Sequence, residues 1–328
     1  MNLKVLSRNE VFVGQPKWRD PGRSNYIAMY SSVFGGVVTD PALMVLPMDD
    51  HMVHRGDGIF EALECLSGQV YNLDAHLSRL QRSAQLISLD LPFDLGTIRE
   101  IILETVAIAS VKDCTLRVFV SRGIGGFGCN PMECHKSNLY VVVLNLEDET
   151  AAQHFCTQGA SAVTVQIPVK PVLFVRAKSC SYLLNALAHL EAHRNNGDFA
   201  IMLDQNGYLA EGPTEGVAIV SKKKIFMYPK PDSRLESTTL LRAVEFTIEL
   251  IKNGDLQGIS CTDISPEEAY NGSEMLIFST GLNVVPILTY DEKKIGTGKP
   301  GPVFLQLWEF FQRDRRENGK VLTLVPHA

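Results

Sequence analysis

The dipeptide Asn206-Gly207 is the feature of the sequence that most constrains the fold. It lies between two apolar runs, and an Asn-Gly pair in that setting is the strongest short-range signal of a β-hairpin. Both turn positions of a type I′ hairpin need positive φ, which asparagine and glycine tolerate best. The sequence therefore predicts two antiparallel strands joined by a type I′ turn, with Glu211 at the end of the second strand.

The first half of the chain combines β-rich runs with two amphipathic segments. Asp74 is a candidate N-cap for a helix whose apolar positions fall on one face, and residues 97–110 repeat the pattern. We expect an antiparallel sheet with these two helices on one face. Its predicted strands are Met29–Val38, Leu43–Pro47, Gly58–Cys65, Gln69–Leu73, Thr115–Ser121 and Leu139–Leu146.

The second half of the chain begins after a polar stretch. Residues 147–153 lack periodicity, so we expect an interdomain linker at residues 149–156. Residues 1–148 would then form a small α/β domain and residues 157–328 a larger one. Its predicted helices are 181–194, 237–252 and 303–317, and its predicted strands are 161–167, 200–203, 217–220, 225–228, 275–279 and 284–288.

Composition and charge exclude several classes of protein. With 45% hydrophobic and 21% charged residues, the 328-residue chain is expected to be a soluble globular protein. A net charge of -6 gives no basic field for nucleic acid or a membrane, and no apolar run reaches the length of a membrane span. Seven scattered cysteines fit free thiols. We expect a cytoplasmic protein; an organelle reached by a transit peptide since removed is the open alternative.

Lys178 and Glu211 are candidates for cofactor chemistry. Lys178 follows an apolar run, where a desolvated lysine loses proton affinity and becomes nucleophilic near neutral pH. Such a lysine forms a Schiff base with an aldehyde cofactor such as pyridoxal phosphate, and a carboxylate keeps the pyridine nitrogen of that cofactor protonated. From spacing alone, a strand-end lysine and a solvated carboxylate remain the alternatives.

A cofactor phosphate needs hydrogen-bond donors, which three places in the sequence offer. Ser237-Thr238-Thr239 stands where a helix should begin, so it offers hydroxyl groups and unpaired backbone N–H groups. Arg79 could add a bidentate cation, and Thr280-Gly281 could add a hydroxyl group and flexible amides. An ordinary N-cap, a solvated arginine and a simple turn are the alternatives.

In chain order, these residues resemble the fold-type IV pyridoxal-phosphate enzymes, which include branched-chain aminotransferases, D-amino-acid aminotransferases and aminodeoxychorismate lyases. Residues 29–36 and 51–56 look most like plant-type members described as D-amino-acid transaminases or branched-chain-aminotransferase-like proteins. The resemblance implies an α/β fold with a pseudo-barrel second domain, and a homodimer with its active site between subunits. The motifs that carry it are Asp57-Gly-Ile-Phe-Glu61, His76-Leu-Ser-Arg79-Leu, Lys178, Gly207-Tyr-Leu-Ala-Glu211-Gly with Thr214, and Phe278-Ser-Thr280-Gly-Leu-Asn-Val-Val-Pro286.

The resemblance also implies roles for the matched residues. Lys178 would form the internal aldimine with pyridoxal 5'-phosphate and then shuttle the proton between the substrate and the cofactor. Glu211 would pair with the pyridine nitrogen, and Tyr182 with the phenolic oxygen, although its count from the lysine is shifted by one. The remaining cofactor-binding residues, most of them for the phosphate, would be Arg79, Thr214, Thr238, Thr239 and Thr280.

Two stretches depart from the family pattern. Leu235-Glu-Ser-Thr-Thr-Leu240 lacks the glycine and arginine that begin the phosphate helix in relatives, and the loop 121–129 lacks the Arg-x-His pair of D-alanine-type enzymes. Arg55 is therefore our candidate for binding the substrate carboxylate, with a structural ion pair to Asp57 as the alternative. The other substrate-pocket candidates are Phe60, Phe127, Met132, Gly281 and Leu282.

An aminotransferase is the predicted function: an amino acid of the D- or branched-chain type gives its amine to the cofactor, and a 2-oxo acid takes it back. An aminodeoxychorismate lyase, which eliminates pyruvate, is the alternative; the glycine-rich loop favours it, and Phe127 in place of an arginine opposes it. A silent binding module would need loss of Lys178 or Glu211, and both are present.

Two other motifs carry no prediction of function. Gly123–Gly128 matches a dinucleotide fingerprint, but Asn130-Pro131 follows where a helix should begin, so we reject nicotinamide binding. Cys129, Cys134 and His135 have no second ligand pair with matching spacing, so we predict no metal site.

Overall fold

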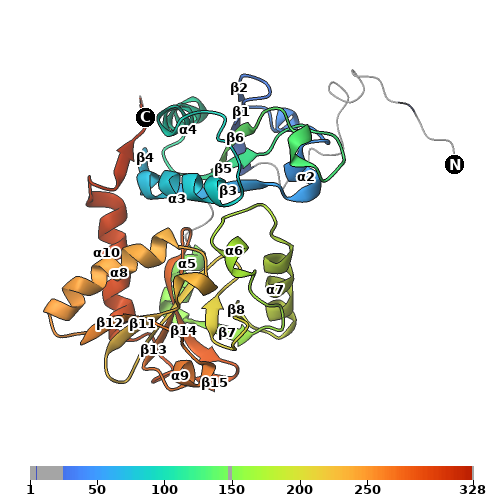
Figure 1. The fold of residues 1–328 in the computed structure, drawn as a ribbon. Coiled ribbons are helices and arrows are strands. Elements are labelled where there is room, and N and C mark those ends of the chain that lie inside the picture. The colour runs from blue at the N-terminus through green and yellow to red at the C-terminus, as the bar shows by residue number, and fades with distance from the viewer. Residues whose placement is uncertain (1–4, 6–24, 147–149, 327–328) are drawn as a thin grey trace.

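The computed structural model describes residue 5, residues 25–146 and residues 150–326. Its strands form two sheets, which occupy the upper and lower halves of Figure 1, with helices packed around them. Within these ranges, no helix is both long enough and apolar enough to cross a bilayer.

The first sheet has seven strands, and every neighbouring pair is antiparallel. The strands are β1 (Tyr26–Ser31), β2 (Gly36–Val38), β3 (Gly58–Leu66), β4 (Gln69–Tyr71), β5 (Cys114–Ser121), β6 (Asn138–Asn145) and β16 (Leu322–Leu324). Their order in the sheet is β16-β4-β3-β5-β6-β1-β2.

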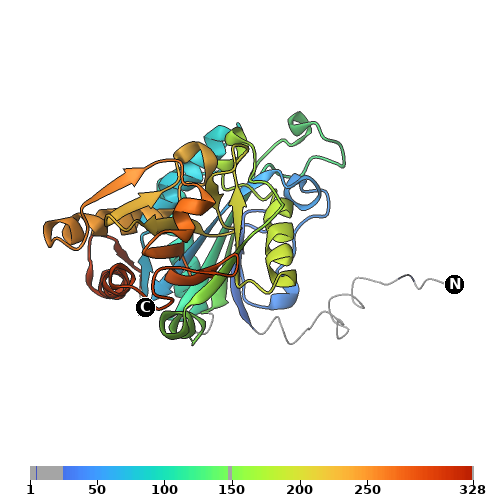
Figure 2. The ribbon, with the colours of Figure 1, turned by 90° about the horizontal axis from the view of Figure 1, so that it is seen from below.

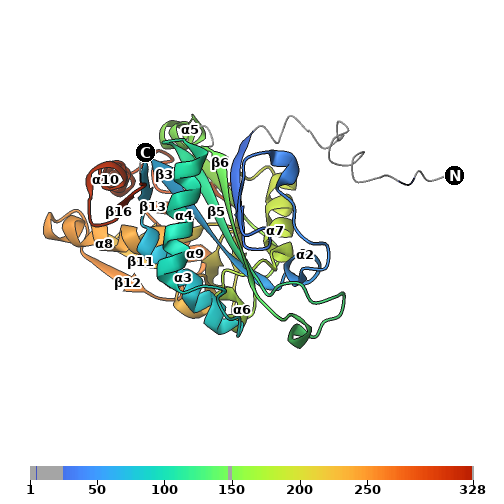
Figure 3. The ribbon, with the colours of Figure 1, turned by 90° about the horizontal axis from the view of Figure 1, so that it is seen from above.

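Two helices cover one face of this sheet, as predicted. α3 (Leu73–Leu86) and α4 (Leu95–Ala109) lie across the strands in Figure 3. Alternate strand residues, such as Ile59 and Leu63, point into the core shared with Leu80 and Ile102 of the helices. Glu61 falls on the same strand face as Ile59 and Leu63, so β3 carries an acid into this apolar layer.

The second sheet has nine strands and is mixed. The strands are β7 (Ala160–Thr164), β8 (Phe199–Leu203), β9 (Leu209–Glu211), β10 (Gly216–Val220), β11 (Ile225–Tyr228), β12 (Gly258–Cys261), β13 (Glu274–Ser279), β14 (Asn283–Tyr290) and β15 (Lys293–Lys294). Their order is β12-β11-β10-β13-β14-β7-β8-β9, with β15 paired to β14. The pairs β11/β12, β14/β7 and β7/β8 are parallel.

Both faces of the second sheet are buried, which explains its near-continuous apolar strands. In β13, Leu276 and Phe278 face the core shared with α8 (Thr238–Lys252) and α10 (Pro302–Glu317), whereas Met275 and Ile277 join the opposite cluster. α7 (Leu183–Arg194) packs on β7 and β8. Figures 1 and 2 agree that α7 lies on the other side of the molecule from α8 and α10.

The junction between the halves differs from the sequence expectation in two details. α5 (Thr150–Gln158) occupies most of the expected linker at 149–156, and Phe155 packs its ring 5.4 Å from that of Phe199. β16 comes from the range assigned to the larger domain, yet it pairs with β4 of the first sheet. The domain division itself stays a prediction.

The predicted hairpin is confirmed, but the prediction that its turn is of type I′ is wrong. β8 and β9 pair antiparallel, and of the two expected positions only Gly207 has positive φ, at 81°. The Asp204 carboxylate accepts hydrogen bonds from the backbone N–H groups of Asn206 and Tyr208 at 2.8 and 3.0 Å. This side chain stabilises a longer turn in which glycine alone is left-handed.

Other local predictions were also wrong. Residues 43–47 do not form a strand; Asp40 instead caps a 3-10 turn at Pro41–Leu43. Asp74 does not cap α3, because Asn72 occupies the N-cap position and Asp74 pairs with Arg99. The short helices α2 (His51–Arg55), α6 (Val172–Val175) and α9 (Pro266–Tyr270) were missed, since one turn shows no periodic pattern.

Candidate active site

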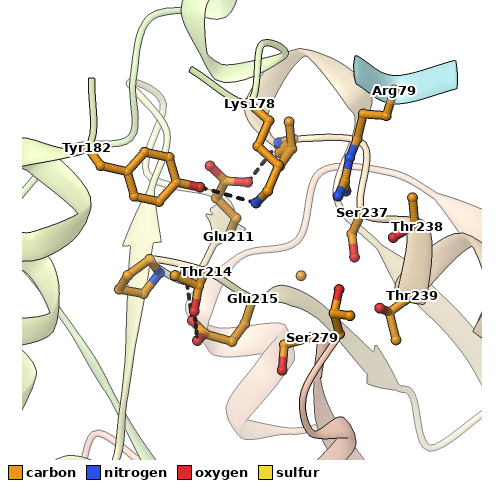
Figure 4. A pocket seen from close by; sticks show the side chains of 15 residues that line it. Arg79, Lys178, Tyr182, Glu211, Thr214, Glu215, Ser237, Thr238, Thr239 and Ser279 are labelled. Atoms are coloured by element: carbon orange, nitrogen blue, oxygen red, sulfur yellow. Dashed lines mark hydrogen bonds between the residues drawn. The ribbon is translucent and has the colours of Figure 1, made fainter. Parts of the chain in front are cut away.

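A hollow lies where α3 meets the second half of the molecule. Figure 4 shows side chains from several elements converging on it: the segment between α6 and α7, the end of β9, the start of α8 and the turn between β13 and β14. Every residue predicted for catalysis or cofactor binding lines it, namely Arg79, Lys178, Tyr182, Glu211, Thr214, Thr238, Thr239 and Thr280.

Lys178 is fixed by backbone pairing to the first sheet. The Phe60 N–H donates to the Lys178 carbonyl at 2.9 Å, and the Cys180 N–H donates to the Gly58 carbonyl at 2.8 Å. The Lys178 N–H donates to Ser83 Oγ at 3.1 Å. The lysine therefore sits on a short strand-like segment along the free edge of β3, which positions it between the two sheets.

The Lys178 amine is buried against two aromatic rings. Its Nζ lies 3.5 Å from Tyr182 Oη and 4.6 Å from the centroid of the Phe60 ring. Burial lowers the pKa of Lys178 to about 8, with help from the charge of Arg79 and against the charges of Glu61 and Glu211. A substantial fraction of this amine is therefore neutral, and so nucleophilic, close to physiological pH.

Glu211 lies at the end of β9 with little to compensate its charge. Burial raises its pKa to about 7, although the Leu235 N–H donates to Oε2 at 2.7 Å. The following turn is tight: the Gly212 N–H donates to the Glu215 carbonyl at 2.8 Å, and a Cβ on Gly212 would lie 2.5 Å from Glu215 Oε2. The Glu215 carboxylate is the flexible end of a side chain, so the firmer constraint on a side chain at 212 is the Ala200 carbonyl, 3.2 Å from that Cβ.

The opposite end of the hollow is rich in hydrogen-bond donors. Ser237 caps α8 by accepting from the Leu240 N–H at 3.2 Å, and the first N–H groups of this helix have no intrahelical partner. In the described part of the chain, the hydroxyl groups of Thr239 and Thr280 make no hydrogen bond. Together with Arg79, they form a donor set that suits a phosphate at a helix N-terminus.

Comparison with known proteins identifies the family. The model described as "Amino-transferase class IV" matches residues 58–290. The chain belongs to the class IV aminotransferases. The Arabidopsis thaliana "D-amino-acid transaminase, chloroplastic" is 37% identical over 330 residues, covering 99% of this chain and 86% of that protein. The D-alanine aminotransferase of Bacillus licheniformis is 25% identical over 279 residues, covering 83% and 92%.

Solved structures show the same fold. A T.th. branched-chain amino acid aminotransferase, crystallised with pyridoxamine 5'-phosphate, superimposes with a TM-score of 0.83 at 23% identity, covering 92% of this chain and 99% of that chain. The predicted fold-type IV architecture and the predicted transaminase class are therefore confirmed.

Two buried residues to which the sequence analysis assigned no role organise the donor end of this aminotransferase. Glu61 accepts from Arg79 Nε and Nη2 at 2.8 and 2.6 Å, and from His76 Nδ1 at 2.7 Å. Burial alone would raise the pKa of Glu61, but the charge and hydrogen bonds of Arg79, with those of His76, lower it to about 2. Because ionised Glu61 can only accept a hydrogen bond, the His76 proton stays on Nδ1, and Nε2 is left as an acceptor facing Thr238 Oγ1, 3.4 Å away.

The residues proposed for substrate binding are not among those that line the hollow. The Arg55 guanidinium donates to the carbonyls of His54, Phe127 and Gly128, and Asp57 pairs with Arg122 at 3.0 Å. The alternative of an Arg55–Asp57 ion pair is therefore wrong. Phe60 packs edge-on against Tyr182 at 5.0 Å. The remaining candidates, outside the lining, are Phe127, Met132, Gly281 and Leu282.

Among residues 25–146 and 150–326, no three side chains of the His, Cys, Asp or Glu type gather closely enough to hold a metal ion. The seven cysteines are free.

Proposed function

We propose that this chain is a pyridoxal 5'-phosphate-dependent aminotransferase that uses Lys178 as its catalytic amine. The observation that carries the proposal is the buried Lys178 Nζ, held between a donor-rich helix end and the Glu211 carboxylate in one hollow. When bound, the cofactor supplies an aldehyde for the amino group and an electron-poor ring that stabilises charge at the substrate α-carbon.

Each side chain then has a task that its position supports. Arg79, Thr238, Thr239 and Thr280 would hold the phosphate group, and Glu211 would keep the ring nitrogen charged. Lys178 would take the proton from the substrate α-carbon and deliver it to the C4′ carbon of the cofactor, since its lowered pKa lets one amine act as base and then as acid. Tyr182 Oη lies 3.5 Å from Lys178 Nζ, so it would face the phenolic oxygen of the cofactor.

An absorbance spectrum tests the cofactor assignment. Purified wild-type protein mixed with pyridoxal 5'-phosphate should develop a visible absorbance band that borohydride abolishes. The Lys178→Ala variant should not develop this band. Lys293→Met is the matched control, because Lys293 lies on the Tyr270 ring away from the hollow. A borohydride-sensitive band of equal strength in Lys178→Ala would refute the role of Lys178.

The substrates proposed are an amino acid, of the D- or branched-chain type, and a 2-oxo acid. The names of the relatives support both types. Each donor should be added singly while conversion to the pyridoxamine form is followed. Pyruvate release from aminodeoxychorismate, without conversion by any amino acid, would favour the lyase alternative, which the names of these relatives do not support.

The substrate-pocket residues remain proposals. Arg55 is retained as a candidate for the substrate carboxylate, since its side chain is exposed beside the loop that follows β5. The other proposed contacts are apolar or backbone contacts from Phe60, Phe127, Gly281 and Leu282.

We also propose a homodimer, which is supported by the exposed apolar side of helix α7. Its sheet-facing side buries Ala188 and Ala192, whereas Leu183, Leu187 and Leu190 are 70%, 39% and 41% exposed. An apolar stripe at this spacing is typical of a covered helix face. Light scattering should give the mass of a dimer for the wild type and of a monomer for the Leu187→Glu/Leu190→Glu variant. The cytoplasmic location stays a prediction; the name of the Arabidopsis relative places that protein in the chloroplast.

A further inference from the structure

A second lysine lies at the edge of the site with no role in the scheme above. Lys170 Nζ is 4.2 Å from the centroid of the Tyr182 ring, and Lys178 Nζ is 5.8 Å from the same centroid. The two ammonium groups therefore share one tyrosine, whose hydroxyl group faces Lys178. Lys170 is half-buried, and burial lowers its pKa, against the charges of Glu211 and Cys180.

The backbone holds Lys170 in this position. It lies in the loop between β7 and α6, where the Val165 N–H donates to the Ile201 carbonyl at 3.1 Å and the Val169 N–H to the Leu203 carbonyl at 3.4 Å. Pro171 follows directly and restricts Lys170 to extended conformations. The ammonium is thus presented beside the Tyr182 ring by a tethered segment.

The ammonium of Lys170 also differs from the neighbouring cations in its partners. Arg79 is bonded to Glu61, Arg122 to Asp57, and Arg234 to the carbonyls of Pro229 and Leu235. Across residues 25–146 and 150–326, the Lys170 ammonium forms a cation–π contact but no hydrogen bond or ion pair. A half-buried cation with free N–H groups, in contact with the tyrosine that also contacts the catalytic amine, is suited to an anionic ligand.

We propose that Lys170 binds the carboxylate group of the amino-acid and 2-oxo-acid substrates. The proposal rests on the aminotransferase function proposed above and adds the residue that recognises the substrate class. Arg55 is the competing candidate, but three of its N–H groups are already bonded to loop carbonyls. Lys170 instead combines a free ammonium with a shared contact to the tyrosine beside Lys178.

Binding of an unreactive acid tests the proposal without turnover. The holoenzyme is titrated by calorimetry with 4-methylvalerate and with its neutral analogue 4-methylvaleramide. The wild type should prefer the acid, and Lys170→Met should weaken acid binding about 10- to 100-fold while leaving the amide unchanged, as expected for one lost charged hydrogen bond. Lys170→Arg should keep most of the preference. Lys293→Met, which removes a lysine from the Tyr270 ring, should behave as the wild type.

The outcomes separate this proposal from the function on which it rests. Equal losses for acid and amide in Lys170→Met, an unchanged preference in that variant, or loss of the preference in Arg55→Met alone would each overturn the role of Lys170. The cofactor band of each variant is recorded first. A wild type without a borohydride-sensitive band overturns the proposed function itself, whereas a normal band with no acid preference overturns the Lys170 proposal alone.

Discussion

Two buried glutamates differ in charge: Glu61 lies behind Arg79 at the donor end of the active-site hollow, and Glu211 lines the hollow itself. Glu61 is held by Arg79 through two hydrogen bonds and by His76 through a third, and its pKa falls to about 2. Glu211 receives one backbone N–H, from Leu235, and burial raises its pKa to about 7. The number and charge of its partners, rather than burial, decide whether a carboxylate in this site is ionised.

The difference assigns the two ends distinct tasks. The donor end is a preassembled ionic structure whose charge does not change near neutral pH. The Glu211 end titrates near neutral pH, so a nearby cation readily changes its protonation.

Removing Arg79 should have the largest effect on stability. Arg79→Met leaves Glu61 buried without its cation, and we expect a loss of about 3–5 kcal/mol in the free energy of unfolding, measured by urea titration of the cofactor-free protein. Arg82→Met is the matched control on the same helix, because its pair with Glu236 is 46% and 45% exposed and should contribute about 0–1 kcal/mol. Equal losses in the two variants would mean that the Glu61 cluster is not an ionic unit.

The pH dependence of stability should distinguish the two glutamates. The folded-state pKa of Glu211, about 7, lies above its ordinary 4.5, so its stabilising contribution is present below pH 4.5 and lost as the pH rises through 7. Between these limits the cofactor-free wild type should lose about 3 kcal/mol relative to Glu211→Gln in urea unfolding.

For Glu61, the same experiment should show the opposite change in the free energy of unfolding with pH. Its folded-state pKa, about 2, lies below 4.5, so the wild type should gain stability relative to Glu61→Gln as the pH rises from 2 to 4.5. If the stability of Glu211→Gln and of Glu61→Gln, each relative to the wild type, changed with pH in the same direction, the two glutamates would not differ in charge as proposed.

Lys178 lies between the two ends, and its reactivity should report on both. Only the neutral amine attacks an aldehyde, so the rate of cofactor capture should rise about tenfold from pH 7 to 9, with a midpoint near 8. Because the charge of Glu211 raises the pKa of Lys178, Glu211→Gln should move the midpoint lower. Stopped-flow absorbance measures the rate; a midpoint near 10.5 would show that Lys178 is not desolvated.

Long periodic elements were predictable from the sequence, and contacts between distant segments were not. The amphipathic stripes of α3 and α8 and the apolar runs of β5 and β13 repeat often enough to be recognised. Arg55 and Asp57 are neighbours in sequence, yet Asp57 pairs with Arg122, because the turn at Gly56 separates the two side chains. The sequence contained one overlooked signal: Glu61 alternates with Ile59 and Leu63, and an acid on an apolar strand face requires a buried cation.

The pairing of β16 with β4 also has a consequence for the order of folding. Residues 69–71 meet residues 322–324, so the edge of the first sheet stays uncovered until almost the whole described chain has been synthesised. Contacts between such distant segments form late, because closing a long loop costs entropy before it yields any contact. A nascent chain that stalls before residue 322 leaves this edge of β4 unpaired, with backbone N–H and C=O groups free to bond to another chain.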